Sequence, residues 1–200
     1  YTRVDTYSYP YTGDPETWDV LGSSRATTGE PLSQCLEGLL EYDAKGDLQP
    51  ALAESYTVSD DGLKYTFTLR KGVKWVDSQG KEISEVTAMD FVNGFQHMMD
   101  TQSGLGDLEA GVVVGVSEYI EGSVGMDQVG VKALDDYTVE YTLVEPCSYY
   151  LTTLEYSAYL PICTPFYESK GGKFGSEYDA TCAYGQTKDD IAYNGPYVCT

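Results

Sequence analysis

The chain has 200 residues, of which 42% are apolar and 22% charged, a composition typical of a folded protein. Its 12 Lys and Arg residues against 32 Asp and Glu residues give a formal net charge of −20. A surface this negative repels nucleic-acid phosphates and anionic lipids, so we expect no nucleic-acid partner and interpret most of the acidity as a source of solubility. No run of about 18 apolar residues is present, and the first ten residues lack a signal-peptide pattern.

The five cysteines do not have the spacing of a metal site. None lies in a C-x-x-C pair and the chain has a single histidine, so we expect no metal and no cofactor. The odd number leaves at least one thiol unpaired, and the spacing leaves any pairing among the others open. The cysteines are Cys35, Cys147, Cys163, Cys182 and Cys199.

The first 30 residues are rich in Gly, Pro, Asp, Ser and Thr and predict loops and short extended pieces. The segment PLSQCLEGLL follows, and its apolar residues recur at helical spacing, which predicts a helix with a buried thiol. The apolar residues of that stripe are Leu32, Cys35, Leu36, Leu39 and Leu40.

Two β-hairpins are predicted further along, with their turns at Asp60-Asp61-Gly62 and at Asp135-Asp136. In each, apolar and polar residues alternate along the strand after the turn, as expected for a strand with one buried face. The alternating apolar residues are Tyr65, Phe67 and Leu69 in the first hairpin and Val139, Tyr141 and Leu143 in the second.

A helix is predicted from Thr87 to Met99, between the hairpins. Thr87 followed by Asp90 resembles a capping box, and an apolar stripe at 91, 95, 98 and 99 marks the buried side. We expect this stripe to pack on one antiparallel sheet that contains both hairpins. His97 lies on the opposite side of the helix and is expected to be exposed to solvent.

The remaining segments predict a Gly-rich helix after a loop within 104–122, a short helix within 146–162, and a helix that Gly171-Gly172 ends. Hairpins alternating with helices, without a regular βαβ repeat, indicate an α+β fold. The end, NGPYVCT, is typical of a turn followed by a strand, so we expect the chain to continue beyond it.

Catalytic motifs are absent from the sequence. It contains no G-x-S-x-G, no phosphate-binding glycine loop and no HExxH. Acidic pairs occur at 60–61, 135–136 and 189–190, but two of these are hairpin turns, where adjacent carboxylates point into water. We therefore expect no enzymatic activity and no catalytic residues in this chain.

Four segments, in this order, resemble the extracytoplasmic oligopeptide- and dipeptide-binding proteins of ABC importers, which are family 5 of the bacterial solute-binding proteins. They are LEGLLEYDAKGDLQPALAESYTVSDDGLKYTFTLRKGVKW (36–75), SEVTAMDFVNGFQHMMD (84–100), VGVKALDDYTVEYTLVEP (129–146) and NGPY (194–197). Together they span most of the chain.

The resemblance implies a two-lobed periplasmic-binding-protein-like (type II) fold, of which these residues form the N-terminal part. Residues 1–47 would begin lobe I, and residues 48–161 would form a mixed α/β domain inserted in it and built on an antiparallel sheet. Residues 162–200 would return into lobe I, and the second lobe would be absent from this chain.

The resemblance also implies a ligand and partners. Peptide-binding members pair the peptide backbone with an extended strand just before the LEGLL segment, here GSSRATTGE, with Ser24, Arg25, Ala26 and Thr27 as the expected contacts. Members often place an aromatic residue from the loop after the TAxDF helix over the peptide, whereas the first tyrosine after that helix here is Tyr119. The expected function is capture of extracellular oligopeptides for a membrane-embedded ABC permease by a monomeric cell-surface lipoprotein or periplasmic protein.

Other functions stay open on the sequence. Within the family the ligand could be an oligosaccharide, which the 19 tyrosines would suit, or haem or a nickel complex, although the His and Cys pattern disfavours nickel. Outside the family, the chain could be a surface adhesion module without a transporter, or part of an enzyme whose catalytic residues lie downstream.

Overall fold

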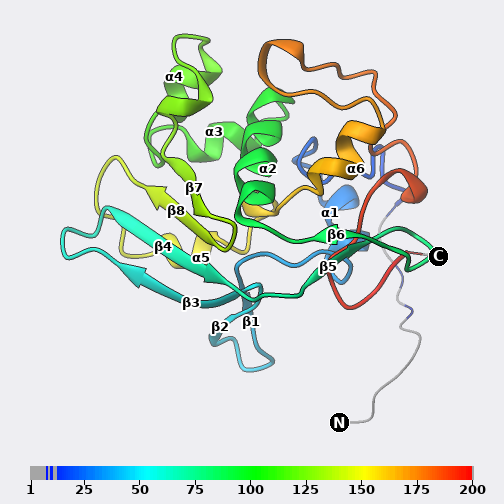
Figure 1. The fold of residues 1–200 in the computed structure, drawn as a ribbon, viewed down its shortest axis with the longest axis horizontal. Coiled ribbons are helices and arrows are strands. Elements are labelled where there is room, and N and C mark those ends of the chain that lie inside the picture. The colour runs from blue at the N-terminus through cyan, green and yellow to red at the C-terminus, as the bar shows by residue number, and fades with distance from the viewer. Residues whose placement is uncertain (1–7, 9, 11–12, 200) are drawn as a thin grey trace.

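A computed structural model describes residues 8, 10 and 13–199 of the chain, in which helices cover one face of an antiparallel sheet (Figure 1). The strands are β1 (Leu40–Tyr42), β2 (Leu48–Pro50), β3 (Ala53–Val58), β4 (Lys64–Leu69), β5 (Lys74–Val76), β6 (Glu82–Glu85), β7 (Val131–Asp135) and β8 (Thr138–Thr142). The α-helices are α1 (Ala26–Leu32), α2 (Ala88–Asp100), α3 (Leu105–Glu109), α4 (Val116–Ile120), α5 (Tyr150–Thr153) and α6 (Thr164–Ser169). Short 3-10 turns are η1 (Met126–Gln128), η2 (Ser157–Tyr159), η3 (Gly175–Glu177) and η4 (Lys188–Asp190).

Both predicted hairpins belong to one four-stranded sheet with the order β3-β4-β8-β7, so this prediction is confirmed. The central strands β4 and β8 pair antiparallel, with Phe67 opposite Val139 and Tyr65 opposite Tyr141. All four of these side chains are buried, because alternate residues of a strand point to the same face. The turns fall at the two Asp pairs, as expected.

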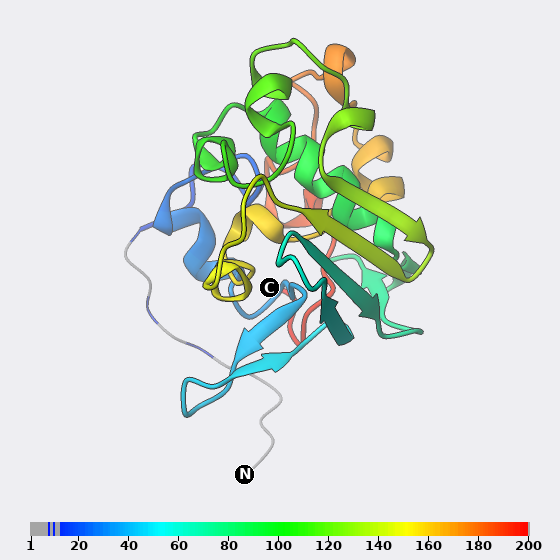
Figure 2. The ribbon, with the colours of Figure 1, turned by 90° about the vertical axis from the view of Figure 1, so that its left-hand side faces the viewer.

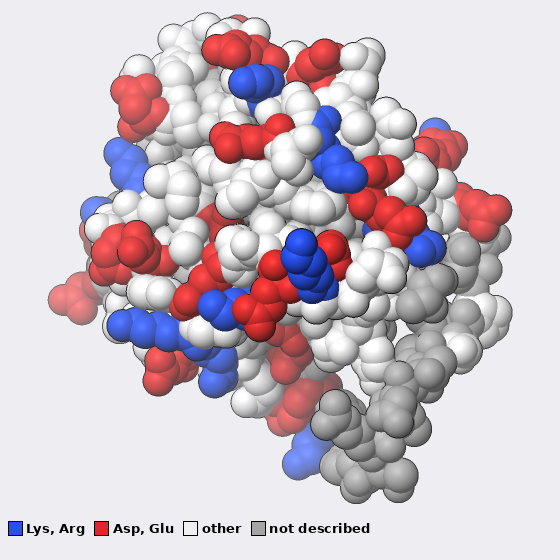
Figure 3. All heavy atoms as spheres, turned by 45° about the vertical axis from the view of Figure 1, so that its right-hand side comes forward, with Lys and Arg blue, Asp and Glu red and all other residues white. Residues whose placement is uncertain are grey.

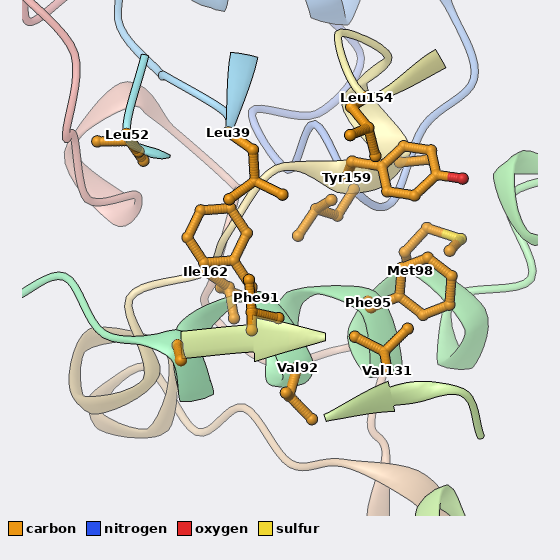
Figure 4. Close-up of a cluster of buried hydrophobic side chains, with 14 of the residues drawn as sticks. Leu39, Leu52, Phe91, Val92, Phe95, Met98, Val131, Leu154, Tyr159 and Ile162 are labelled. Atoms are coloured by element: carbon orange, nitrogen blue, oxygen red, sulfur yellow. The ribbon is translucent and has the colours of Figure 1, made fainter. Parts of the chain in front are cut away.

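Helix α2 covers the buried face of this sheet, most closely over β7 and β8 (Figure 2). Its capping box is formed as predicted: the backbone N–H of Thr87 donates to Asp90 Oδ2 over 2.9 Å, and the Thr87 side chain accepts from the backbone of Asp90. The stripe predicted to be buried is buried, and Figure 4 shows Phe95 pointing from α2 toward Tyr159. The close-up also shows Phe91 on the side of the helix that faces Leu39.

His97 is buried, with 1% of its surface exposed, so the prediction of a solvent-exposed histidine is wrong. Its Nε2 atom lies 2.7 Å from Asp19 Oδ2, and the rings of Tyr167 and Tyr184 pack against its imidazole. The side of α2 that faces away from the sheet is covered by a second layer, built from the segment before α1 and from α6 and the segment that follows it. Because both segments are distant in sequence, the helical periodicity of α2 could not indicate that layer.

The helix predicted over Leu32–Leu40 is also wrong. Helix α1 ends at Leu32, and strand β1 begins at Leu40 and pairs with β2. Between them the backbone hydrogen-bonds to distant segments: Cys35 accepts from the Gly195 N–H over 3.0 Å, and the Gly38 carbonyl accepts from Leu52 over 3.0 Å. Burial, in contrast, follows the predicted stripe, since Leu32, Cys35, Leu39 and Leu40 are all in the core.

Two short helices, α3 and α4, replace the single Gly-rich helix expected within 104–122. Gly115 separates them with φ of +77°, and a Cβ atom there would lie 2.5 Å from the carbonyl oxygen of Gln128. Only glycine fits that left-handed conformation without displacing backbone. The short helices at α5 and α6 agree with the predictions, and α6 ends before Gly171-Gly172.

The segment after α6 is joined to the ribbon of strands β5 and β6. Strands β5 and β6 form a two-stranded ribbon, and Val76 of β5 also forms an antiparallel bridge with Tyr193. The two backbone hydrogen bonds of this bridge are 2.8 and 2.9 Å long. Just beyond this bridge, the Gly195 N–H donates to the Cys35 carbonyl over 3.0 Å, so the chain there lies beside the segment that follows α1.

Acidic side chains are spread across the face shown in Figure 3 and are interspersed there with lysines and arginines. Among the described residues, no helix has the length and apolarity needed to cross a membrane. The described part of the chain also contains no cluster of three or more His, Cys, Asp or Glu side chains placed to hold a metal ion.

Candidate functional site

A groove of about 750 Å³ lies between α1, the segment that follows it, and the segment that joins α5 to α6. This volume falls within the range of small-molecule and peptide sites. The described residues that line it are Pro10, Val20, Ala26, Gly29, Glu30, Leu32, Ser33, Gln34, Leu36, Glu37, Gly38, Leu40, Glu41, Ala51, Leu154, Glu155, Tyr156, Ser157, Leu160 and Pro196.

One wall of the groove, residues 33–38, is held by the NGPY segment. The buried Asn194 side chain accepts from the Glu37 N–H over 3.0 Å and donates to the Glu37 carbonyl over 3.1 Å. Gly195 lies directly against the chain at Cys35, where a Cβ atom would be 2.7 Å from the Cys35 carbonyl carbon. These contacts explain why this wall is neither helix nor strand: its backbone groups are bound by a segment 157 positions away.

The opposite wall is formed by residues 154–160, between α5 and α6. The Leu154 side chain is buried in the core, and its carbonyl oxygen lies close to Gly38 across the groove floor, 3.5 Å from the position of a Cβ atom there. Tyr156 is 56% exposed and so presents most of its ring to solvent at the groove. An exposed aromatic ring beside a groove is suited to packing on a ligand.

The groove is acidic. Among the described residues that line it, four are glutamates and none is Lys or Arg. Burial and the neighbouring carboxylate of Glu41 raise the pKa of Glu37, and burial raises the pKa of Glu155. Removal of these carboxylates from water therefore costs free energy that a cationic group in the groove would offset.

The predicted contacts Ser24, Arg25, Ala26 and Thr27 lie where α1 begins. Only Ala26 lines the groove; Ser24 and Arg25 are exposed, and the Arg25 guanidinium forms an ion pair of 3.0 Å with Glu16. Their role in ligand binding stays a prediction.

The extended backbone expected for this segment is present at Arg25, which has φ −88° and ψ 134°, but Ala26 and Thr27 are the first residues of α1. The helix forms because Thr28 and Leu32, four residues apart, share one buried side. That i, i+4 spacing was the signal in the sequence for this helix.

Tyr119, the first tyrosine after α2, lies in a second hollow of about 570 Å³ rather than in the groove. Its hydroxyl donates to Asp100 Oδ1 over 2.7 Å and accepts from Gln96 Nε2 over 2.9 Å. The other Asp100 oxygen accepts from the Gly175 N–H over 2.6 Å. Tyr119 therefore joins α4 to α2 and η3.

The groove wall at 154–160 and the clamp by Asn194 were not predicted as parts of a site. The sequence carried one relevant signal, the NGPY motif. Its asparagine contacts Glu37 within LEGLL, and its glycine contacts Cys35 just before LEGLL. No local pattern indicated residues 154–160, because they reach the groove only through packing of α5 on the sheet.

Comparison with known proteins places the chain and its fold in a defined class. The sequence profile of the bacterial extracellular solute-binding proteins, family 5, matches residues 47–200, and the chain belongs to this family. As its class description states, these are extracellular binding proteins for solutes.

Individual relatives are oligopeptide-binding proteins. The chain is 44% identical over 193 residues to the oligopeptide-binding protein AmiA of Streptococcus pneumoniae, a match that covers 96% of this chain and 28% of AmiA. The substrate-binding domain of an oligopeptide ABC transporter from Bacillus anthracis superposes with a TM-score of 0.76 at 34% identity, over 92% of this chain and 33% of that one. OppA of Haemophilus influenzae, solved in complex with RPPGFSPFR, superposes with a TM-score of 0.75 at 29% identity, over 92% of this chain and 34% of that one.

These matches confirm the resemblance and the α+β, periplasmic-binding-protein-like fold predicted from the sequence. The chain spans about 28% of the length of the AmiA relative it matches.

Proposed function

We propose that this chain is the N-terminal part of the substrate-binding component of an ABC importer, and that it captures extracellular oligopeptides for a membrane-embedded permease. The observation that carries the proposal is the groove beside α1, which is open and is lined by both apolar and polar residues. An open groove that presents an exposed tyrosine ring and four glutamates suits peptides with varied side chains and a cationic amino terminus.

In this proposal the chain divides as the family resemblance implies. Residues 1–47 begin lobe I, residues 48–161 form the inserted domain, and residues 162–200 return to lobe I, where Asn194 and Gly195 clamp the groove wall. A second lobe, which lies outside these residues, closes over the ligand. The protein is a monomer, anchored as a cell-surface lipoprotein or free in a periplasm.

Ser24, Arg25, Ala26 and Thr27 are proposed as ligand contacts at the groove entrance. The exposed position of the first three and the place of Ala26 in the groove lining support this assignment. Because the lining is acidic, the groove binds the ammonium group of a peptide, or a basic side chain, more readily than a carboxylate.

The test is a calorimetric titration of the full-length protein with peptides of two to six residues, a disaccharide, haem and a nickel complex. We expect the peptides to bind and the other solutes to give no heat of binding. Binding of only a sugar, haem or nickel would contradict the peptide assignment, and binding of none of these solutes would favour an adhesion module.

A pair of variants localises the site. Ala26→Trp places a large ring in the groove, and it should weaken peptide binding at least tenfold. Leu134→Trp is the control, because Leu134 is 55% exposed on β7 and is not part of the groove lining. Equal affinity of the Ala26→Trp variant and the unmodified protein would remove this groove from the proposed site.

A further inference from the structure

Two cysteines far apart in sequence meet at the groove wall. The Sγ atoms of Cys35 and Cys199 lie 3.4 Å apart, although the residues are 164 positions apart in the chain. Each Sγ also lies 3.7 Å from the carbonyl oxygen of Pro31, in the last turn of α1. Both side chains therefore point into the same small space between α1 and the segment that contains Cys199.

Contacts that do not involve the thiols hold Cys35 beside Gly195 of the NGPY segment, four residues before Cys199. The Gly195 N–H donates to the Cys35 carbonyl over 3.0 Å, and Asn194 binds both backbone groups of Glu37. A disulfide requires the two sulfur atoms to be about 2.05 Å apart, so these atoms, now 3.4 Å apart, need a further approach of only about 1.4 Å.

The two thiols differ in access and in acidity. Cys35 is buried, with 4% of its surface exposed, whereas Cys199 is only partly buried. The hydrogen bond between the two thiols lowers the pKa of Cys199 and, together with burial, raises the pKa of Cys35. The lowered pKa favours the thiolate form of Cys199, which is the form that reacts with disulfides.

We propose that Cys35 and Cys199 are joined by a disulfide bond in the exported protein, and that this bond fixes the wall of the groove. The chain belongs to an extracellular family, and disulfides persist in extracellular compartments. The inference does not depend on which solute the groove takes.

The oxidation is a thiol–disulfide exchange with an external disulfide, either a low-molecular-weight disulfide or the disulfide of an extracytoplasmic oxidoreductase. The Cys199 thiolate attacks one sulfur of that disulfide, a mixed disulfide forms, and one external thiolate leaves. Cys35 then loses its proton, and its sulfur attacks the sulfur of Cys199, which releases the second external thiolate. Two protein thiols are oxidised by two electrons, and the external disulfide is reduced to two thiols.

The bond would act on the groove because Cys35 stands between two lining residues, Gln34 and Leu36, and Cys199 follows the lining residue Pro196. A covalent link at this point joins the two chain segments that form the wall. It also closes a loop of more than 160 residues, so reduction should lower the melting temperature by about 5–15 °C.

The first experiment maps the bond in the full chain. The protein is equilibrated with a mixture of reduced and oxidised glutathione, free thiols are alkylated, and the digested peptides are identified by mass spectrometry. We expect a linked peptide pair that contains Cys35 and Cys199 and that disappears after treatment with dithiothreitol. Separate alkylation of both residues, or a bond from either one to a different cysteine, would overturn the proposal.

The second experiment tests the effect on the groove wall by hydrogen exchange and thermal unfolding of the oxidised and reduced protein. Reduction should speed amide exchange in residues 29–41 and lower the melting temperature. A Cys35→Ser/Cys199→Ser variant should lose this response to reduction, and Cys182→Ser, the control, should keep it. If reduction of the unmodified protein changes neither exchange in 29–41 nor the melting temperature, the bond does not fix the wall.

Discussion

Gly94, in the middle of α2, offers a test in which local preference and tertiary packing predict opposite results. In an exposed helix, replacing Gly by Ala stabilises the protein by about 1 kcal/mol, because alanine loses less backbone entropy on folding. By helix propensity alone, Gly94→Ala should therefore raise the free energy of unfolding.

The packing of α2 reverses that expectation. A Cβ atom on Gly94 would lie 2.6 Å from the Leu160 carbonyl oxygen and 3.1 Å from the backbone nitrogen of Ile162. Both are backbone atoms, and the Ile162 N–H is already bound to the Asp90 carbonyl over 3.0 Å, so the segment cannot move away freely. Overpacking a core costs about 1–3 kcal/mol, and rigid neighbours place this site near the upper end. After the gain in propensity is subtracted, we expect a net loss of about 2 kcal/mol.

Gly29 in α1 is the matched control. A Cβ atom there meets no heavy atom within 4 Å, so Gly29→Ala should stabilise the protein by about 0.5–1 kcal/mol. Urea unfolding of both variants, with the slope of free energy against urea checked for constancy, measures the two changes. A neutral or stabilising Gly94→Ala would refute the close approach of α2 to residues 160–162.

Two further predictions concern the core. Phe95→Ala should lower the free energy of unfolding in urea by about 3–5 kcal/mol, because Phe95 is 1% exposed and packed among aromatic rings. Met89→Ala, at an exposed position of α2, should lower it by under about 1 kcal/mol, and similar losses in the two variants would contradict the placement of the helix. Burial raises the pKa of Glu109 from 4.5 to about 7 although the Tyr159 hydroxyl donates to its carboxylate, so the folded state binds the proton more tightly than the unfolded state. As the pH rises from 4.5 to 7, ionisation of Glu109 should lower the free energy of unfolding by an amount on the order of 3 kcal/mol. Over that range the stability of the Glu109→Gln variant should therefore rise relative to that of the unmodified protein. A constant difference in stability between about pH 4.5 and 8 would contradict the burial of a titrating carboxyl.

The sheet and α2 could be predicted from the sequence because their signals are local. Alternation at Tyr65 and Phe67 reports which face of a strand is buried, and the capping pair Thr87 and Asp90 lies within one turn of helix. These patterns require only that some apolar surface covers the buried side. They do not require knowledge of which segment supplies it.

The groove wall and the burial of His97 could not be predicted in this way. Residues 33–38 carry the apolar spacing of a helix, but their backbone groups are bound by Asn194 and Gly195, which lie about 160 positions later in the chain. His97 is buried by Asp19, which lies 78 positions before it, and by residues of α6 and of the segment after α6. Helical periodicity shows which side of a helix is apolar, but it does not show whether a segment distant in sequence packs on the other side.

The motifs that carried the family resemblance are one another's partners in the folded chain. The Asp90 carboxylate, in the TAMDF segment, accepts from the indole N–H of Trp75 in LRKGVKW over 3.1 Å and from the Thr87 backbone over 2.9 Å. Its second oxygen accepts from the Thr164 hydroxyl over 2.9 Å, at the start of α6. A buried carboxylate is costly unless such donors surround it, so each segment is stable in its place only when the others are present.

The same reciprocity holds at the groove, where NGPY and LEGLL meet through Asn194 and Glu37. Three of the four segments, which look independent in the sequence, thus meet in two sets of polar contacts. One set, around Asp90, joins α2 to β5 and α6, and the other holds the groove wall. Two of the segments that carry the family resemblance, LEGLL and NGPY, therefore also form one wall of the groove.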